Sequence, residues 1–264
     1  MRPPAPIATD RRARTRIHVD RAQADEARGP LRVRTGVEVS DPTVSALRPI
    51  LMHRGPTAAR VSLVPEGALL LAGDAIEVQV VLGPGAALEI VEPGGTVAFD
   101  MRGDSARWQV DIRLAEDARL TWAGEPFVVA GGADVERRTA VELAPGAALA
   151  LRETLVLGRY GEPAGRLHQH TVVQSEDRPV LIEDLPLDPH TAPLLLGGHR
   201  VLSTVLLAGE ATTGRAAPAG PVGPVGQDRF DLERAGVLWR RLAVEAHLAD
   251  LGAAWAAARQ AVVP

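Results

Sequence analysis

Apolar and polar residues alternate along several stretches of this chain, a pattern that predicts β-strands with one buried face. In residues 107–114, the apolar side chains of Trp108, Val110, Ile112 and Leu114 occupy every second position, and polar side chains fill the positions between them. This two-residue period is typical of a half-buried antiparallel strand. Residues 76–80 repeat it, and proline and glycine pairs such as Pro84-Gly85 and Pro145-Gly146 mark turns that keep the strands short. We therefore predict a mainly β protein.

Four segments of the chain resemble one another, and each reads as strand, tight turn, strand. They cover residues 64–71, 82–90, 114–122 and 143–151. Repeats at such spacing are typical of stacked β units, in which each unit buries the apolar surface that its neighbour alone leaves exposed. When the segments are aligned on Leu69, Leu88, Leu120 and Leu149, a carboxylate follows four or five residues later in each: Asp74, Glu92, Glu125 and Glu153. We predict a β-helix-like stack of short antiparallel or coiled strands that carries an acidic column.

The flanking segments differ from this core, and they suggest four parts along the chain. Residues 1–30 are rich in arginine and poor in apolar side chains, which predicts a flexible N-terminal arm. Residues 31–211 form the predicted β-rich core, and residues 212–226 are a Pro/Gly-rich loop. Residues 227–264 are expected to supply a closing strand and a C-terminal α-helix, because Leu248, Leu251, Trp255 and Ala258 recur at helical spacing.

The composition excludes several classes of function. The chain has no cysteine and no lysine, so thiolate metal ligands, a lysine Schiff base and a P-loop lysine are all excluded. A formal net charge of −4 provides no basic field for nucleic acid, and no apolar run is long enough to span a membrane. No apolar leader follows the Arg11-Arg12 pair, so we expect a soluble, cytoplasmic protein that binds neither nucleic acid nor membrane.

The acidic column permits two interpretations. Strand alternation places Glu153 on the same face as Leu149, Leu151, Leu155 and Leu157, where an unpaired carboxylate is costly. Glu153 either pairs with a core arginine, while Glu92 ends its strand in solvent at Pro93, or both residues line a polar interior that contains water. In the second case, we expect Asp74, Glu92 and Glu153 to lie along one internal passage.

Two histidines form a second candidate site. His168 and His170 lie two residues apart on a predicted strand, so both imidazoles point to the same side, a spacing that suits a metal ion. The alternative is a pair of solvated histidines with no ligand role, since no third ligand is close in the sequence. We find no catalytic triad with a nucleophile elbow, no dinucleotide loop and no zinc signature.

The ordered set of segments resembles the urease accessory protein D family, UreD, also called UreH. The resemblance begins with Leu71-Ala72-Gly73-Asp74 and continues through the repeated segments to residues 153–162, which include Gly158, Arg159 and Glu162. It ends with the strand at residues 180–185 and the closing segment at residues 237–259. The chain departs from the family pattern at residues 91–99, and it stops at Pro264 where many members continue.

This resemblance implies a urease maturation scaffold rather than an enzyme. Such a protein binds apo-urease, recruits the accessory proteins UreF and the GTPase UreG, and assists delivery of nickel to the dinuclear active site. Nickel would then be a transient cargo, with Asp74, Glu92, Glu125, Glu153, His168 and His170 as expected ligands. Weak oxygen ligands suit a conduit because the ion must also leave. The alternatives are a β-solenoid carbohydrate hydrolase that uses paired carboxylates, and an interaction module without metal traffic.

Overall fold

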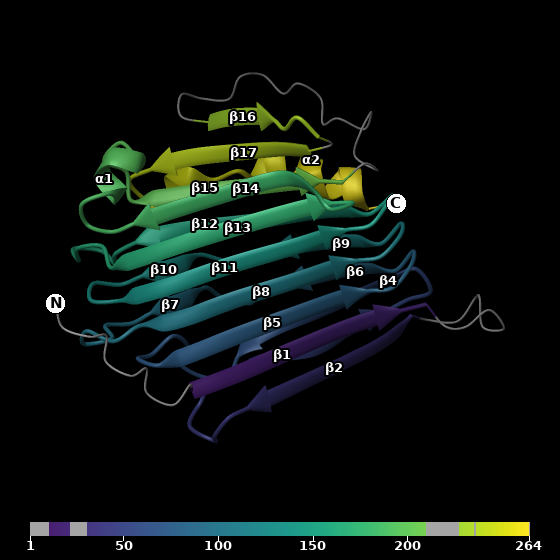
Figure 1. Ribbon diagram of the computed structural model, residues 1–264, viewed down its shortest axis with the longest axis horizontal. Helices are drawn as coiled ribbons and strands as arrows, with labels where there is room; N and C mark the ends of the chain where they lie inside the picture. The colour runs from purple at the N-terminus through teal and green to yellow at the C-terminus, as the bar shows by residue number, and fades with distance from the viewer. Residues whose placement is uncertain (1–10, 22–30, 210–226, 235, 264) are drawn as a thin grey trace.

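Two β-sheets, the one-turn helix α1 (Ala192–Leu195) and a short C-terminal helix make up the computed structural model, which describes residues 11–21, 31–209, 227–234 and 236–263 (Figure 1). Sheet A has the spatial order β14 (Arg178–Leu187), β13 (Arg166–Ser175), β11 (Asp134–Leu143), β8 (Ala106–Leu114), β5 (Asp74–Leu82), β1 (Arg11–Asp20) and β2 (Arg32–Val39). Sheet B has the order β16 (Gln227–Asp231), β17 (Gly236–Ala243), β15 (Val201–Ala208), β12 (Ala148–Leu157), β9 (Arg119–Ala123), β6 (Ala87–Val91), β4 (Ala58–Pro65) and β3 (Leu47–Arg54). The predicted Pro/Gly-rich loop, residues 212–226, lies outside the described residues.

The chain winds between the two sheets as a solenoid. Strand β5 of sheet A leads to β6 of sheet B, and β8 to β9 and β11 to β12 repeat this path one level further on. The short strands β7 (Thr96–Ala98) and β10 (Phe127–Val129) also belong to sheet B, where β10 pairs in parallel with both β7 and the end of β12. The predicted stack of coiled strands is therefore confirmed, and the repeated tight turns are the corners at which the chain passes from one sheet to the other.

The repeat alignment is correct for three of its four members. Leu88 pairs with Leu120 in parallel register, and Leu120 pairs with Leu149, so these leucines form one row across β6, β9 and β12. The next residue of the row is Ala59 of β4, not Leu69, which lies buried outside the strands. The antiparallel assignment of residues 107–114 is also wrong, because β8 runs parallel to both β5 and β11. Because successive turns of the solenoid run in the same direction, the equivalent strands of neighbouring turns are parallel.

The core lies between the sheets and follows the predicted alternation. Trp108, Val110 and Ile112 of β8 are buried, and so are Ile76 and Val78 of β5. Each solenoid level contributes an equivalent apolar layer, so neighbouring levels complete the core for one another. None of the described helices has the length and apolar character needed to cross a bilayer.

The N-terminal segment contains a strand, and this corrects the prediction of a flexible arm for Arg11–Asp20. Strand β1 lies between β2 and β5, antiparallel to the first and parallel to the second. Ala13, Thr15, Ile17 and Val19 point into the core, and the residues between them are more exposed. The strong arginine content lies on the outer face, which is why the composition suggested an arm although the alternation is that of a strand.

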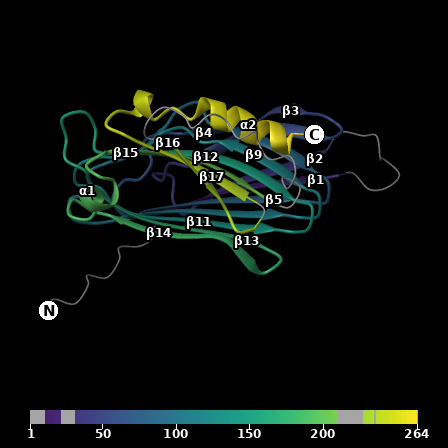
Figure 2. The same cartoon turned by 90° about the horizontal axis from the view of Figure 1, so that it is seen from above.

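The C-terminal helix is shorter than predicted. Residues 246–249 form a 3₁₀ turn, and helix α2 (Gly252–Val262) begins only after Leu248 and Leu251, two of the residues that predicted it. Helix α2 packs against β12, β15 and β9 on the outer face of sheet B (Figure 2). Its buried face consists mainly of Ala254, Ala258 and Ala261, and Leu248 is half exposed. Small side chains permit close packing of a helix on a sheet, so the alanine face turns inward.

A candidate polar site in the solenoid interior

Three of the four predicted acidic residues line one small cavity between the sheets. Glu92 follows β6, Glu125 follows β9 and Glu153 lies within β12, so the parallel pairing of these strands brings the three carboxylates to one cavity, with Glu125 one residue beyond the level of the other two. Sheet A closes the cavity with residues of β8 and β11, including Arg137 and Thr139. The cavity has a volume of about 30 Å³. This is room for roughly two water-sized molecules.

Glu92 is held by two hydrogen bonds. The indole Nε1 of Trp122 donates to Oε1 of Glu92 at 2.8 Å, and the backbone N–H of Glu125 donates to Oε2 at 3.0 Å. Burial raises the pKa of Glu92 above its usual range, and these two bonds and the positive charge of Arg137 oppose the shift. Glu92 therefore does not end its strand in open solvent, and a cation that enters the cavity would favour its charged form.

Glu153 forms an ion pair with Arg137 of β11, which is 7% exposed. The guanidinium of Arg137 also donates from Nη1 to Oε1 of Gln169 at 2.5 Å, and it stacks 5.2 Å from the ring centre of Phe127. Both interpretations of Glu153 are thus correct in part. The carboxylate has the core arginine as its partner, and it also faces the polar cavity.

Glu125 occupies the more exposed side of the cavity. Arg152 Nη2 lies 3.0 Å from Oε1 of Glu125, and both side chains are partly exposed. The Arg152 guanidinium in turn lies 5.7 Å from the ring centre of Trp255 in helix α2. The acidic site is therefore connected to the outer face of sheet B, on which the C-terminal helix packs.

Several buried donors also belong to residues of the cavity wall. Trp108 Nε1, Arg137 Nε and Thr139 Oγ1 are buried and have no hydrogen-bond partner among the described residues, and all three belong to residues of the cavity wall. Buried polar atoms of this kind are normally satisfied by protein groups or ordered water. The interior at this level is therefore suited to a hydrated ligand.

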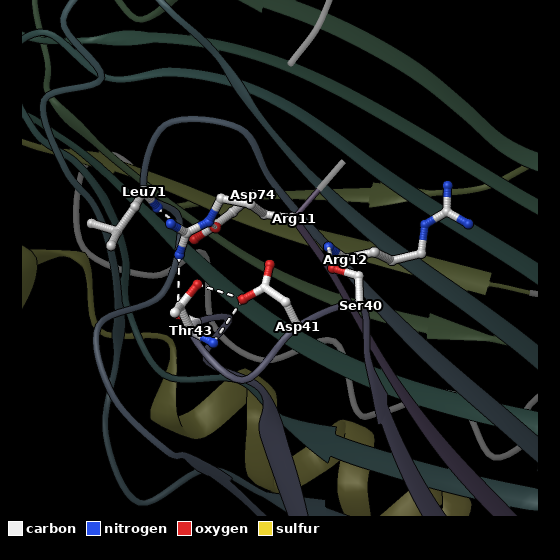
Figure 3. A network of polar contacts seen from close by, with 7 residues as sticks. All are labelled: Arg11, Arg12, Ser40, Asp41, Thr43, Leu71 and Asp74. Atoms are coloured by element: carbon white, nitrogen blue, oxygen red, sulfur yellow. Dashed lines mark hydrogen bonds and ion pairs between the residues drawn. The ribbon is translucent and has the colours of Figure 1, made fainter. Parts of the chain in front are cut away.

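Asp74 does not belong to this site, so the prediction of a four-member acidic column is wrong at this position. Asp74 begins β5 in sheet A, is 1% exposed, and does not line the cavity. Its Oδ1 accepts from Arg11 Nε at 2.8 Å, and its Oδ2 accepts from the backbone N–H of Leu71 at 2.8 Å (Figure 3). Arg11 Nη2 also donates to the carbonyl of Thr43 at 3.2 Å. Through Arg11, Asp74 therefore anchors the start of strand β1 to the start of strand β5.

The two histidines lie apart from the cavity. His168 and His170 are on the outer face of sheet A, about half exposed, and both approach Asp184 of β14. Sequence reasoning missed Asp184, because the pairing of β13 with β14 is not visible in the sequence spacing. Among the described residues, no three histidine, aspartate or glutamate side chains are gathered in a metal-binding arrangement.

The two glycines named in the family resemblance, Gly73 and Gly158, adopt backbone conformations that favour glycine. Gly73 and Gly158 have φ angles of +79° and +78°, which L-residues with side chains rarely adopt. Arg159 and Glu162 form a bidentate pair on the surface, with Nε to Oε2 at 2.9 Å and Nη2 to Oε1 at 2.7 Å. This pair holds the turn that follows β12.

Sequence reasoning also missed Arg137 and Gln169, the sheet A side of the interior site. The signal was present in the alternation. Arg137 occupies an inward position of β11 between Val135 and Val141, and Gln169 occupies one in β13 beside Leu167. A polar side chain at an inward position of a strand points to an internal partner.

Comparison with known proteins agrees with the resemblance of the sequence. The family described as UreD urease accessory protein matches residues 9–263. The chain is 41% identical over 228 residues to the urease accessory protein UreD 1 of Streptomyces griseus, which covers 83% of this chain and 84% of that protein. It is 34% identical over 229 residues to the urease accessory protein UreD of Frankia casuarinae, which covers 78% of this chain and 72% of that protein.

Proposed function

The chain belongs to the UreD family of urease accessory proteins, and from this premise we propose that it is a non-catalytic scaffold for nickel insertion. Membership of the family gives it a role in urease maturation. In the proposal, the chain binds apo-urease in the cytoplasm, recruits UreF and the GTPase UreG, and provides a transient path for nickel. The observation that carries the metal part of the proposal is the convergence of Glu92, Glu125 and Glu153 on one polar cavity.

The chemistry of this cavity supports transient rather than permanent binding. Carboxylate oxygens and water bind nickel less tightly than thiolates would, and the chain has no cysteine. Each carboxylate also has a competing partner, which is Arg137 for Glu153, Arg152 for Glu125 and the Trp122 indole for Glu92. An ion that enters gains oxygen ligands but displaces these partners, so its net affinity stays moderate and release is possible.

The size of the cavity sets a condition on this path. Room for about two water-sized molecules is too little for an ion that keeps a full shell of six waters. The ion must therefore exchange water for carboxylate oxygen, or Arg137 must move away from Glu153. In the proposal, partner binding favours the open arrangement, because this chain contains no nucleotide-binding loop to supply the energy itself.

The carbohydrate-hydrolase alternative receives no support from this geometry. Paired catalytic carboxyls must flank a sugar and a water molecule, with enough space for both. Here the carboxylates line a cavity of about 30 Å³, and Glu153 is engaged by Arg137. We therefore expect the purified chain to hydrolyse neither glycans nor urea nor nucleotides.

Co-expression with urease tests the proposal in two separable steps. A tagged chain should retain apo-urease, UreF and UreG in a pull-down, and urease made without the chain should contain little nickel and show low activity. Failure to retain urease would overturn the scaffold role. Full nickel content without the chain would overturn the delivery role even if the complex forms.

A further inference from the structure

We propose that a groove on the outer face of sheet B is a docking site for an acidic amphipathic helix of a partner protein. This outer groove lies beside helix α2, and it shares no lining residue with the interior cavity. That the partner belongs to the urease maturation machinery rests on the proposed function above. The outer groove and the chemistry of its occupant rest on the residues that line it.

The outer groove has a volume of about 310 Å³ and two kinds of wall. Its floor is the outer face of β4, β6 and β9, and its side is the C-terminal end of α2, with Val262 and Val263. Val263 is 47% exposed. On the edge strand β3, Ile50 is also 47% exposed, and its pairing with Ser62 places it on the same outer face. Exposed apolar side chains therefore flank the outer groove, as is typical of a helix-binding surface.

The floor of the outer groove repeats the surface on which α2 packs. One row of outer-face residues crosses sheet B, from Ala148 of β12 through Arg119 of β9 and Ala87 of β6 to Ala58 of β4. Ala148 packs with Ala258 of α2 in one apolar cluster. Ala87 and Ala58 present equally small side chains on the other side of Arg119, and Ala58 is exposed. The floor therefore permits the close approach of a second helix.

The spacing of the strands also fits a helix beside α2. Helix α2 contacts β12 and both of its neighbours, β15 and β9, so it is centred over β12. Adjacent strands are about 4.8 Å apart, so β6, the second strand from β12, lies about 10 Å away from it. The axes of two packed helices are about 8–10 Å apart. A helix over β6 would thus contact both the sheet and the flank of α2.

The charges of the outer groove favour an acidic occupant. Three arginines line it, Arg60, Arg119 and Arg259, together with one carboxylate, that of Glu89. Glu89 is shared, because its oxygens lie 3.4 Å from Arg60 Nε and 3.1 Å from Arg259 Nη2. Arg119 donates from Nη1 to the carbonyl of Val262 at 3.1 Å, which is a neutral group. The outer groove is therefore positive in a chain of net charge −4, and acidic side chains that flank the apolar stripe of a helix complement it.

A partner strand and a second copy of this chain fit the outer groove less well. A strand would have to add to β3, which contains Pro49 and a register shift between Leu51 and His53. Prolines and bulges on an edge strand oppose strand addition. Neither described α-helix of the chain, α1 or α2, carries an acidic residue, so the described part of a second copy offers no complementary α-helix.

Peptide binding to the purified full-length chain tests the outer groove without any partner protein. The probe is a fluorescent helical peptide with alanine and leucine on one face and glutamate on both flanks, and the matched probe carries lysine in place of glutamate. We expect the glutamate peptide to bind, less tightly at high salt, and the lysine peptide to bind at least about tenfold more weakly. Ala58→Trp places a bulky side chain at an exposed position of the floor, so it should preserve folding but weaken binding about tenfold or more.

Two charge variants test the direction of the electrostatic effect. Arg60→Glu should weaken binding of the glutamate peptide about fivefold, whereas Glu89→Gln, which removes the carboxylate between two arginines, should tighten it about threefold. Arg138→Glu on the outer face of sheet A is the matched control and should leave binding unchanged. Absence of binding, equal binding of both peptides, or wild-type affinity with Ala58→Trp would overturn the docking site.

Photocrosslinking in the complex with apo-urease, UreF and UreG identifies the natural occupant. A benzophenone amino acid replaces His53, which is exposed at the margin of the outer groove, and Arg138 is the control position. We expect crosslinks from position 53, but not from position 138, to an acidic helix of one of these proteins. Crosslinks to this chain itself, to a segment without acidic residues, or to nothing in an assembled complex would overturn the proposal. Failure of the wild-type complex to assemble would overturn the proposed function, and the peptide measurements would still decide the docking site.

Discussion

The guanidinium of Arg137 on β11 pairs with the carboxylate of Glu153 on β12, and this ion pair joins the two sheets across the solenoid interior. Their side chains are 8% and 15% exposed, so most of the pair is removed from water. Charges in such a position cost desolvation free energy, which the pairing and the additional contact with Gln169 offset. The pair therefore connects the stability of the fold with the polarity of the proposed nickel path.

Removal of one partner from this pair should destabilise the protein strongly. Arg137→Met leaves Glu153 without its partner, and Glu153→Leu leaves the buried guanidinium of Arg137 with Gln169 alone. Each single change should lower the free energy of unfolding by about 3 kcal/mol or more. The double variant should lose less than the sum of the two, because no uncompensated charge remains. Urea denaturation of the four proteins measures this coupling.

The surface pair Arg113–Glu142 is the control, with Nε and Oε2 3.1 Å apart and both side chains well exposed. The corresponding substitutions Arg113→Met and Glu142→Leu should each change the free energy of unfolding by at most about 1 kcal/mol. Additive losses at Arg137 and Glu153, or equal losses at both pairs, would show that the interior pair is solvated like a surface pair.

Glu92 should make the stability of the protein depend on pH in the direction opposite to that of most carboxylates. Burial raises the pKa of Glu92 in the folded state above the ordinary value of 4.5. The folded state therefore binds the proton more tightly than the unfolded state, and stability falls as the pH rises from about 4.5 through the raised pKa. Above that pKa, the loss of stability caused by the charged carboxylate no longer changes with pH.

Comparison with Glu92→Gln isolates this effect. The glutamine variant cannot titrate at this position, so its free energy of unfolding should improve relative to the wild type as the pH rises through the same window. The altered hydrogen bonds to Trp122 and Glu125 add an offset that does not change with pH. A constant difference between the two proteins from pH 4 to pH 8 would contradict the raised pKa.

Gly158 should tolerate a side chain much less well than Gly161 in the same turn. Both have positive φ angles, +78° and +74°, so alanine at either site should cost about 1–2 kcal/mol in backbone strain. A Cβ atom at Gly158 would also lie 2.8 Å from the carbonyl oxygens of Glu162 and Pro163, whereas none of the other described atoms lies within 4 Å at Gly161. Thermal unfolding should show the larger loss for Gly158→Ala, and equal losses would show that the turn can relax.

The stacked repeats could be predicted from the sequence because local signals and global architecture agree in them. The row of Leu88, Leu120 and Leu149 was readable, since each leucine follows a turn at the same distance. Glu92 and Glu153 then meet in one cavity because parallel strands preserve the four-residue spacing from coil to coil, and Glu125, one residue further on, reaches the same cavity. Periodicity therefore predicted both the stack and most of its acidic row.

The remaining parts depend on pairing between segments that are distant in the sequence. Asp74 faces Arg11, 63 residues away, and the arginine-rich composition around Arg11 concealed a strand with clear alternation. Arg137 is 16 residues from Glu153 and on the opposite sheet, so only the solenoid path makes them neighbours. No local pattern specifies these partners, although an arginine at an inward position of β11 indicates that it has an acidic or polar partner in the interior.

The most direct test of the nickel path is the nickel content of urease purified after co-expression with Glu153→Gln. The amide retains a hydrogen-bond acceptor for Arg137 but removes the charge that would bind the ion. Glu142→Gln, which neutralises an exposed carboxylate of β11, is the matched control. We predict that both variants retain urease in a pull-down, but that only Glu153→Gln lowers bound nickel and urease activity. Normal nickel loading with Glu153→Gln, in a complex that assembles normally, would contradict a path through the interior carboxylates.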